Sequence, residues 1–175
     1  MAAGRMVGVS VGIMIGLIIC LVLFRYMNRD SRVKTQYDEM QEITRGRAYK
    51  YAFWAMVICE SVLGILALGE IRIPMEPMVI HFSVLLIGII VQCSYCIFKD
   101  AYIGINTNSR RFIIVMIVAG LINLLSCAGA IRSHEMVIDG MISTPAVNLL
   151  CGLMCLMVCV EIWIKNLMDK RESED

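Results

Sequence analysis

Five continuous runs of apolar residues divide this chain, at 6–24, 51–68, 78–98, 112–131 and 146–164. Each run is 18 to 21 residues long, and a helix needs roughly 20 apolar residues to cross the hydrocarbon core of a bilayer. The runs do not alternate between apolar and polar positions, as the strands of a membrane barrel would. The pattern therefore predicts an all-α polytopic membrane protein, a bundle of five transmembrane helices that forms one domain over residues 1–175.

The basic residues are sorted to one side of these runs. Thirteen of the sixteen lysines and arginines lie in the segment 25–50, in the loop 99–111 or in the tail after residue 164, while Arg5, Arg72 and Arg132 lie on the other side. Because basic residues of short loops stay in the cytoplasm, we expect the N-terminus outside, the C-terminus inside and a cytoplasmic segment at 25–50. No small-residue cleavage site follows the first run, which favours a retained anchor over a signal peptide.

The segment 25–50 is the longest piece outside the runs. Thr35 followed by Asp38 resembles a capping box, and Tyr37, Met40 and Thr44 then share one helical face. The segment is either a solvated extension of the helix at 51–68, bent at Gly46, or a helix that docks on a cytoplasmic partner. Nucleic acid is not an expected partner, because no basic stripe is interleaved with exposed aromatic residues.

Glycines recur every fourth residue along the first run. Gly4, Gly8, Gly12 and Gly16 share this spacing, and the last three lie within the run. Small residues at this interval allow two helix backbones to approach closely in a membrane. Gly8, Gly12 and Gly16 are therefore candidate helix-packing residues, either against another span of this chain or against a second membrane protein.

Glu60 lies near the middle of the run 51–68. A carboxylate at that depth costs at least ~2.5 kcal/mol to insert, so we expect it to face other helices and to have a partner. Gln92 and Asn123 lie at a similar depth in their own runs and are the candidate partners, and Gly64, one turn along, predicts a packed face. The site either couples a proton or an ion or is a structural hydrogen bond between helices.

Two other ionisable residues lie about one turn inside the ends of their runs. His81 is near the beginning of 78–98, and Glu161 is near the end of 146–164. Both side chains are long enough to reach the headgroup region, so we expect them at the membrane interface.

The chain has eight cysteines, and all of them lie inside the runs. Cys151, Cys155 and Cys159 share one helical face and suit close helix packing. The pair Cys93-x-x-Cys96 raises the possibility of a thiol redox protein, although it falls in the cytoplasmic half of its run and no cysteine pair in an outer loop accompanies it. No metal-ligand set, phosphate-binding loop or nucleophile elbow is present, so we expect neither a catalytic residue nor a cofactor.

Two stretches of the chain, 45–54 (RGRAYKYAFW) and 96–106 (CIFKDAYIGIN), together with the pair Arg110 and Arg111, resemble small uncharacterised integral membrane proteins of Gram-positive bacteria. The resemblance covers the middle of the chain. It implies a multi-pass protein of a bacterial plasma membrane, and it implies no activity and no site residues.

The chain has several sets of small residues suited to helix packing and few residues suited to catalysis. This favours a non-enzymatic membrane protein, an accessory or interaction subunit of a membrane complex. Its expected partners are the lipid bilayer, a membrane protein at the first run and a cytoplasmic protein at residues 25–50. The alternative is a small proton- or ion-coupled transporter or channel that uses Glu60. A third hypothesis is a membrane thiol redox protein that uses Cys93 and Cys96.

Overall fold

A computed structural model describes Met14, Ile18 and residues 36–104 and 109–172 of the chain. The predicted span at 6–24, with Gly8, Gly12 and Gly16, and residues 25–35 of the segment 25–50 lie outside the described part. The chain divides into two compact units, Met1–Gln36 and Tyr37–Asp175. The fold described below is that of the second unit.

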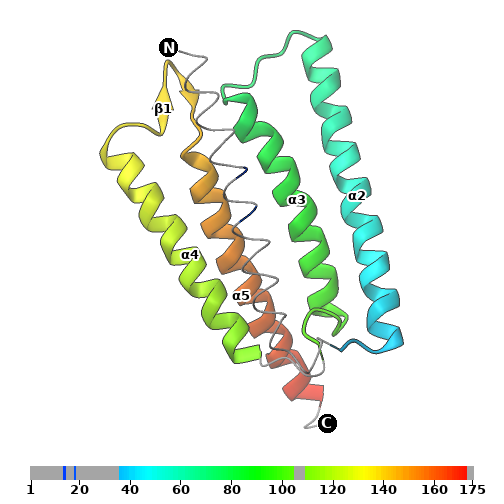
Figure 1. The fold of residues 1–175 in the computed structure, drawn as a ribbon. Helices are drawn as coiled ribbons and strands as arrows, with labels where there is room; N and C mark the ends of the chain where they lie inside the picture. Colours follow the sequence, from blue (N-terminus) through cyan, green and yellow to red (C-terminus); the bar gives the residue numbers. More distant parts are fainter. Residues whose placement is uncertain (1–13, 15–17, 19–35, 105–108, 173–175) are drawn as a thin grey trace. The chain divides into compact units, whose positions relative to one another are not determined.

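The second unit is built from four long helices. They are α2 (Glu39–Leu68), α3 (Pro77–Phe98), α4 (Ser109–Arg132) and α5 (Ala146–Glu172) (Figure 1). Each of the four is long and apolar enough to cross a membrane. They correspond to the predicted runs 51–68, 78–98, 112–131 and 146–164, so the expected all-α class is confirmed for the described residues.

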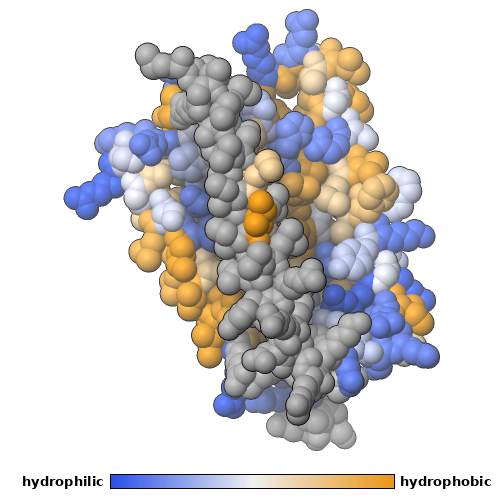
Figure 2. Space-filling view, in the orientation of Figure 1, coloured by the Kyte–Doolittle hydropathy of each residue, from blue (hydrophilic) through white to orange (hydrophobic). Residues whose placement is uncertain are grey.

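The helices pack in the spatial order α2, α3, α5, α4. The two middle helices have a neighbour on each side, and they bury more of their apolar segments than α2 and α4 do. Many large apolar side chains of α2 and α4 are therefore exposed. In Figure 2, hydrophilic residues gather around the beginning of α2 and hydrophobic residues farther along it.

A small hairpin ties the connections together at one end, which we call the hairpin end. Strands β1 (Val137–Ile138) and β2 (Met141–Ile142) pair antiparallel, and Met75, from the α2–α3 connection, bridges to Ile142. The Glu76 carboxylate accepts a hydrogen bond of 2.8 Å from the Thr144 backbone N–H. The connection between α2 and α3 is thus bonded to the connection between α4 and α5. This hairpin was not predicted from the sequence.

Helix α2 begins twelve residues before the predicted run. Its N-cap is Asp38, whose side chain accepts from the Gln41 backbone N–H while Gln41 reaches back to the Asp38 N–H. The capping box is therefore Asp38 with Gln41, whereas Thr35, the first residue of the expected pair, lies outside the described residues. The helix continues through Gly46 for 30 residues, about 45 Å at 1.5 Å per residue. It is longer than the ~30 Å hydrocarbon core, and residues 39–50 continue the predicted helix at 51–68 without a break. The continuous helix fits both the extension and the docking interpretation of this segment.

Helices α4 and α5 approach each other closely at two glycines. A Cβ atom built on Gly152 would lie 2.8 Å from the Leu124 side chain and 3.3 Å from the carbonyl oxygen of Gly120. A Cβ atom on Gly120 would lie 3.2 Å from that of Cys155, which is buried. Small residues thus set this helix contact, as they commonly do in membranes.

Candidate functional site

Glu60 is bonded to His81 across the contact between α2 and α3. The Glu60 Oε1 atom lies 3.1 Å from the His81 Nδ1 atom. By helix rise, Glu60 is about 12 Å before the end of α2 and His81 about 6 Å after the beginning of α3. The pair therefore lies within the apolar helices, towards the hairpin end.

This geometry differs from the expected one in two respects. The side chains of Glu60 and His81 are 46% and 63% exposed, so the expected packing of the Glu60 face was wrong. Asn123 donates a 2.9 Å hydrogen bond to Ala119 of its own helix, and α4 packs on α5. Gln92 lies half-buried in the second half of α3. Glu60, Gln92 and Asn123 are not brought together, and the partner of Glu60 is His81.

The pair borders a hollow of about 310 Å³, which we call the Glu60 hollow. Its walls come from α2, from the α2–α3 connection and from the beginning of α3. The other lining residues are apolar or glycine: Leu63, Gly64, Leu66, Ala67, Ile71, Ile73, Pro77 and Ile80. Of the ten lining residues, only Glu60 and His81 carry titratable side chains.

A second polar contact joins α3 to α5. The Ser94 hydroxyl donates a 2.7 Å hydrogen bond to Oε1 of Glu161. The other carboxylate oxygen of Glu161 is buried and has no hydrogen-bond partner among the described residues. Glu161 therefore faces a neighbouring helix, whereas its position near the end of the run 146–164 predicted a place at the membrane interface.

Tyr102, in the loop after α3, lies beside this contact. The Cys93 thiol donates to the Tyr102 hydroxyl at 3.7 Å, and the ring packs edge-on against Phe112. Burial raises the pKa of Tyr102 well above its usual range, so the phenol stays neutral at physiological pH.

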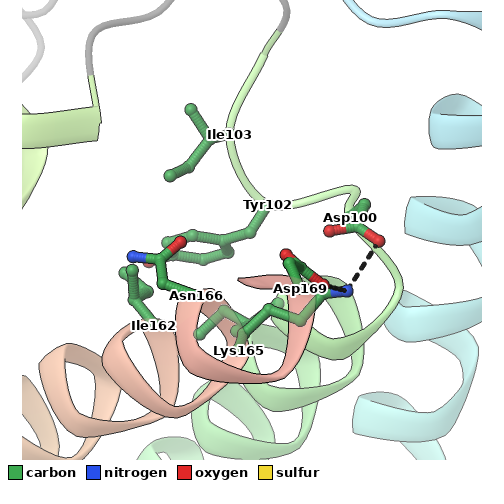
Figure 3. Close-up of a pocket in the computed structure, with 8 residues that line it drawn as sticks. Asp100, Tyr102, Ile103, Ile162, Lys165, Asn166 and Asp169 are labelled. Carbon is green, nitrogen blue, oxygen red and sulfur yellow. Dashed lines mark hydrogen bonds and ion pairs between the residues drawn. The ribbon is translucent and has the colours of Figure 1, made fainter. Parts of the chain in front are cut away.

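Lys165 joins the same loop to α5 at the end opposite the hairpin, which we call the loop end. Its ammonium lies 3.0 Å from the Asp100 carboxylate and 2.6 Å from that of Asp169 (Figure 3). Tyr102 and Asn166 help to line a hollow of about 150 Å³ beside these groups. Because Asp100 and Asp169 both bind Lys165, we interpret these ion pairs as a structural contact that holds the loop after α3 against α5.

Helix α2 holds the loop from the other side. The Gln41 amide donates to the Asp100 carbonyl at 2.6 Å, and the Arg45 guanidinium donates to the Ala101 carbonyl at 3.3 Å. Ala48 and Ala101 are fully buried in the same contact. The stretches 45–54 and 96–106, which carry the resemblance to bacterial membrane proteins, thus contact each other. The i, i+4 spacing of Gln41 and Arg45 places both side chains on one helical face. This spacing could have indicated a contact at the beginning of α2, and it was not used for a prediction.

The seven described cysteines are free thiols. Cys93 bonds to Tyr102, and Cys96 is only 2% exposed. The thiol redox hypothesis stays a prediction. Within the described ranges, no group of three or more His, Cys, Asp or Glu side chains could hold a metal ion.

Comparison of the chain with protein-family models, with curated proteins and with solved structures finds no match. Its function is therefore argued from its own residues.

Proposed function

We propose that this protein is a non-enzymatic subunit of a membrane complex, with five transmembrane helices, the N-terminus outside and the C-terminus inside. The described basic residues support this orientation. The loop end holds most of them, namely Arg45, Arg47, Lys50, Lys99, Arg110, Arg111, Lys165, Lys170 and Arg171, whereas Arg72 and Arg132 lie at the hairpin end. Basic residues favour the cytoplasmic side, which makes the loop end cytoplasmic. The bacterial plasma membrane is proposed from the sequence resemblance alone.

The observation that carries the proposal is the beginning of α2. Met40 and Ile43 are 71% and 52% exposed, on a part of the helix that extends beyond the length of the hydrocarbon core. They lie three residues apart and therefore share one face. Gln41 and Arg45 bond a neighbouring face to the loop, which fixes the helix in place. We call residues 39–50 together with the loop 99–104 the inner platform. A fixed helix with exposed apolar anchors fits the groove of a partner protein.

The test is a purification of the tagged, full-length protein in mild detergent at native expression, followed by mass spectrometry of the retained proteins. We expect one partner in stoichiometric amount. The double variant Met40→Lys, Ile43→Lys should lose that partner, because two ammonium groups would enter an apolar groove. Met168→Lys is the matched control, since Met168 is 47% exposed near the end of α5 and outside the platform. A monomer or homo-oligomer alone would contradict the proposal.

The glycine face of the first run extends the proposal on sequence grounds. Cysteines placed beside Gly8, Gly12 and Gly16 should give crosslinks to a second membrane protein if this face serves assembly. Crosslinks found only within the chain would remove this face from the interaction surface.

The bond between Glu60 and His81 favours a second candidate function, a small proton- or ion-coupled transporter or channel. An acid and a base in contact within apolar helices can exchange a proton. The experiment compares proton flux in vesicles that contain the wild-type protein or Glu60→Gln. An equal flux would exclude Glu60 from the mechanism.

A further inference from the structure

We propose that the Glu60 hollow binds a lipophilic organic cation, whose charge the Glu60 carboxylate neutralises. This inference goes beyond the interaction function, because the hollow is at the hairpin end and the inner platform is at the loop end.

The walls of the hollow indicate the apolar part of the ligand. Eight of its ten lining residues are apolar or glycine, and its volume of about 310 Å³ lies at the lower end of small-molecule sites. Lipid tails would fit such walls equally well, so the walls alone select no ligand. Selection must come from the two polar groups at the edge of the hollow.

Those polar groups favour a positive charge. A carboxylate accepts about four hydrogen bonds, and Glu60 is bonded to His81 through Oε1 while its side chain stays 46% exposed. The carboxylate therefore has room for a second, cationic partner. An anionic ligand is disfavoured, because His81 is the one basic residue lining the hollow and it already faces a carboxylate.

The same groups disfavour a metal ion. Structural zinc sites take four protein ligands and calcium takes six to eight oxygens, whereas two side chains converge here. An organic cation needs no such ligand set, because its charge is spread out and shielded by apolar groups that the walls can contact. The exposed side chains also leave the hollow open, so that a ligand dissolved in the bilayer can reach it.

The charge of the carboxylate matches the charge of the cation. When the imidazole of His81 is neutral and donates from Nδ1–H to Glu60, the pair carries one negative charge, which the cation balances. Glu70, Arg72 and Glu76 of the α2–α3 connection do not line the hollow, and neither does any residue of α5. The Glu60 carboxylate is therefore the acid of the lining that can bind the cation.

The experiment measures equilibrium binding of tetraphenylphosphonium to the purified full-length protein. We expect saturable binding. Tetraphenylborate has the same shape and the opposite charge, and it should not bind. Equal binding of both ions would overturn the proposal.

Four variants separate the parts of the site. Glu60→Gln should abolish binding, and His81→Asn should retain it, because asparagine keeps a donor near the position of Nδ1. A Cβ atom on either Gly64 or Gly129 meets nothing within 4 Å. Gly64→Leu should fill the hollow and abolish binding, whereas Gly129→Leu makes the same change in α4, away from the hollow, and should bind normally. Retained binding in Glu60→Gln or Gly64→Leu would overturn the proposal, whatever the result of the partner purification. Elution of each variant as a single species checks its folding.

Discussion

At the scale of single residues, the hydroxyl of Ser94 is the described partner of the Glu161 carboxylate. Removing it leaves both carboxylate oxygens without a partner in the described part of the chain, and an unsatisfied polar group costs about 1–3 kcal/mol. We expect Ser94→Ala to lower the free energy of unfolding by that amount, measured by denaturant titration in detergent.

Ser61→Ala is the matched control for this change. Ser61 bonds to the carbonyl of Val57 in its own helix, so its loss removes no contact between helices and should change the free energy of unfolding by less than ~0.5 kcal/mol. Equal losses in the two variants would show that the contact between Ser94 and Glu161 adds nothing to stability.

The phenol of Tyr102 gives a prediction about pH. Burial raises its pKa above the usual range, so the folded protein keeps the proton while the unfolded chain loses it near pH ~10. Its contribution to stability is complete below that pH and is lost as the pH rises further. Ultraviolet titration of the folded protein should therefore show the same tyrosinate signal in wild type and Tyr102→Phe near pH ~10. A smaller signal in Tyr102→Phe would contradict the assignment.

The partner of Glu60 shows what the sequence could predict at this scale. An acid within an apolar run had to have a polar partner, and it has one. The identity of that partner was wrong, because candidates were sought near the middles of the runs. In two antiparallel helices joined by a short connection, residues at similar distances from that connection lie side by side. His81 is four residues from the beginning of α3, whereas Gln92 is fifteen residues from it, or about 22 Å along the helix axis.

At the scale of elements, apolar runs located four helices but not all their ends. Helices α2 and α5 continue into charged segments, where bonds such as Asp38 to Gln41 and Lys165 to Asp169 stabilise the extra turns.

The sequence contains a local pattern for the hairpin, and it was not recognised. Asp139 and Gly140 lie between two apolar pairs and both have positive φ angles, which suits a two-residue turn. The contacts of the loop 99–104 join distant parts of the chain, and no local pattern encodes them.

The contact between α4 and α5 is sensitive to added volume at Gly152. A side chain there would overlap Leu124 and the backbone of Gly120, so Gly152→Leu should separate the helices and cost several kcal/mol in the free energy of unfolding. Gly129→Leu, in α4 and open to its surroundings, should be tolerated. Disulfide crosslinking of cysteines placed on α4 and α5 measures the distance directly. Efficient crosslinking in Gly152→Leu would show that this close approach is not required.

At the scale of the whole molecule, the two ends of the described helices differ in charge and in construction. The hairpin end is held by backbone pairing and by Glu76, and it has few basic residues. The loop end is held by side chains such as Gln41, Arg45 and Lys165, and basic residues gather there. A side-chain network among many cations suits the cytoplasmic face, where anionic headgroups attract lysine and arginine. The proposed orientation thus places the inner platform where a cytoplasmic partner can reach it.

Cysteine labelling in intact cells tests this orientation and the fifth span together. A membrane-impermeant maleimide should label Ser133→Cys at the hairpin end without permeabilisation and Arg171→Cys at the loop end only after it. The unmodified chain gives the background, because its own thiols lie in the apolar runs. If the run at 6–24 crosses the membrane, Ala3→Cys should be labelled from outside like Ser133→Cys. Labelling of Ala3→Cys only after permeabilisation would mean that this run does not cross, and reversed labelling of the other two would place the inner platform outside the cell.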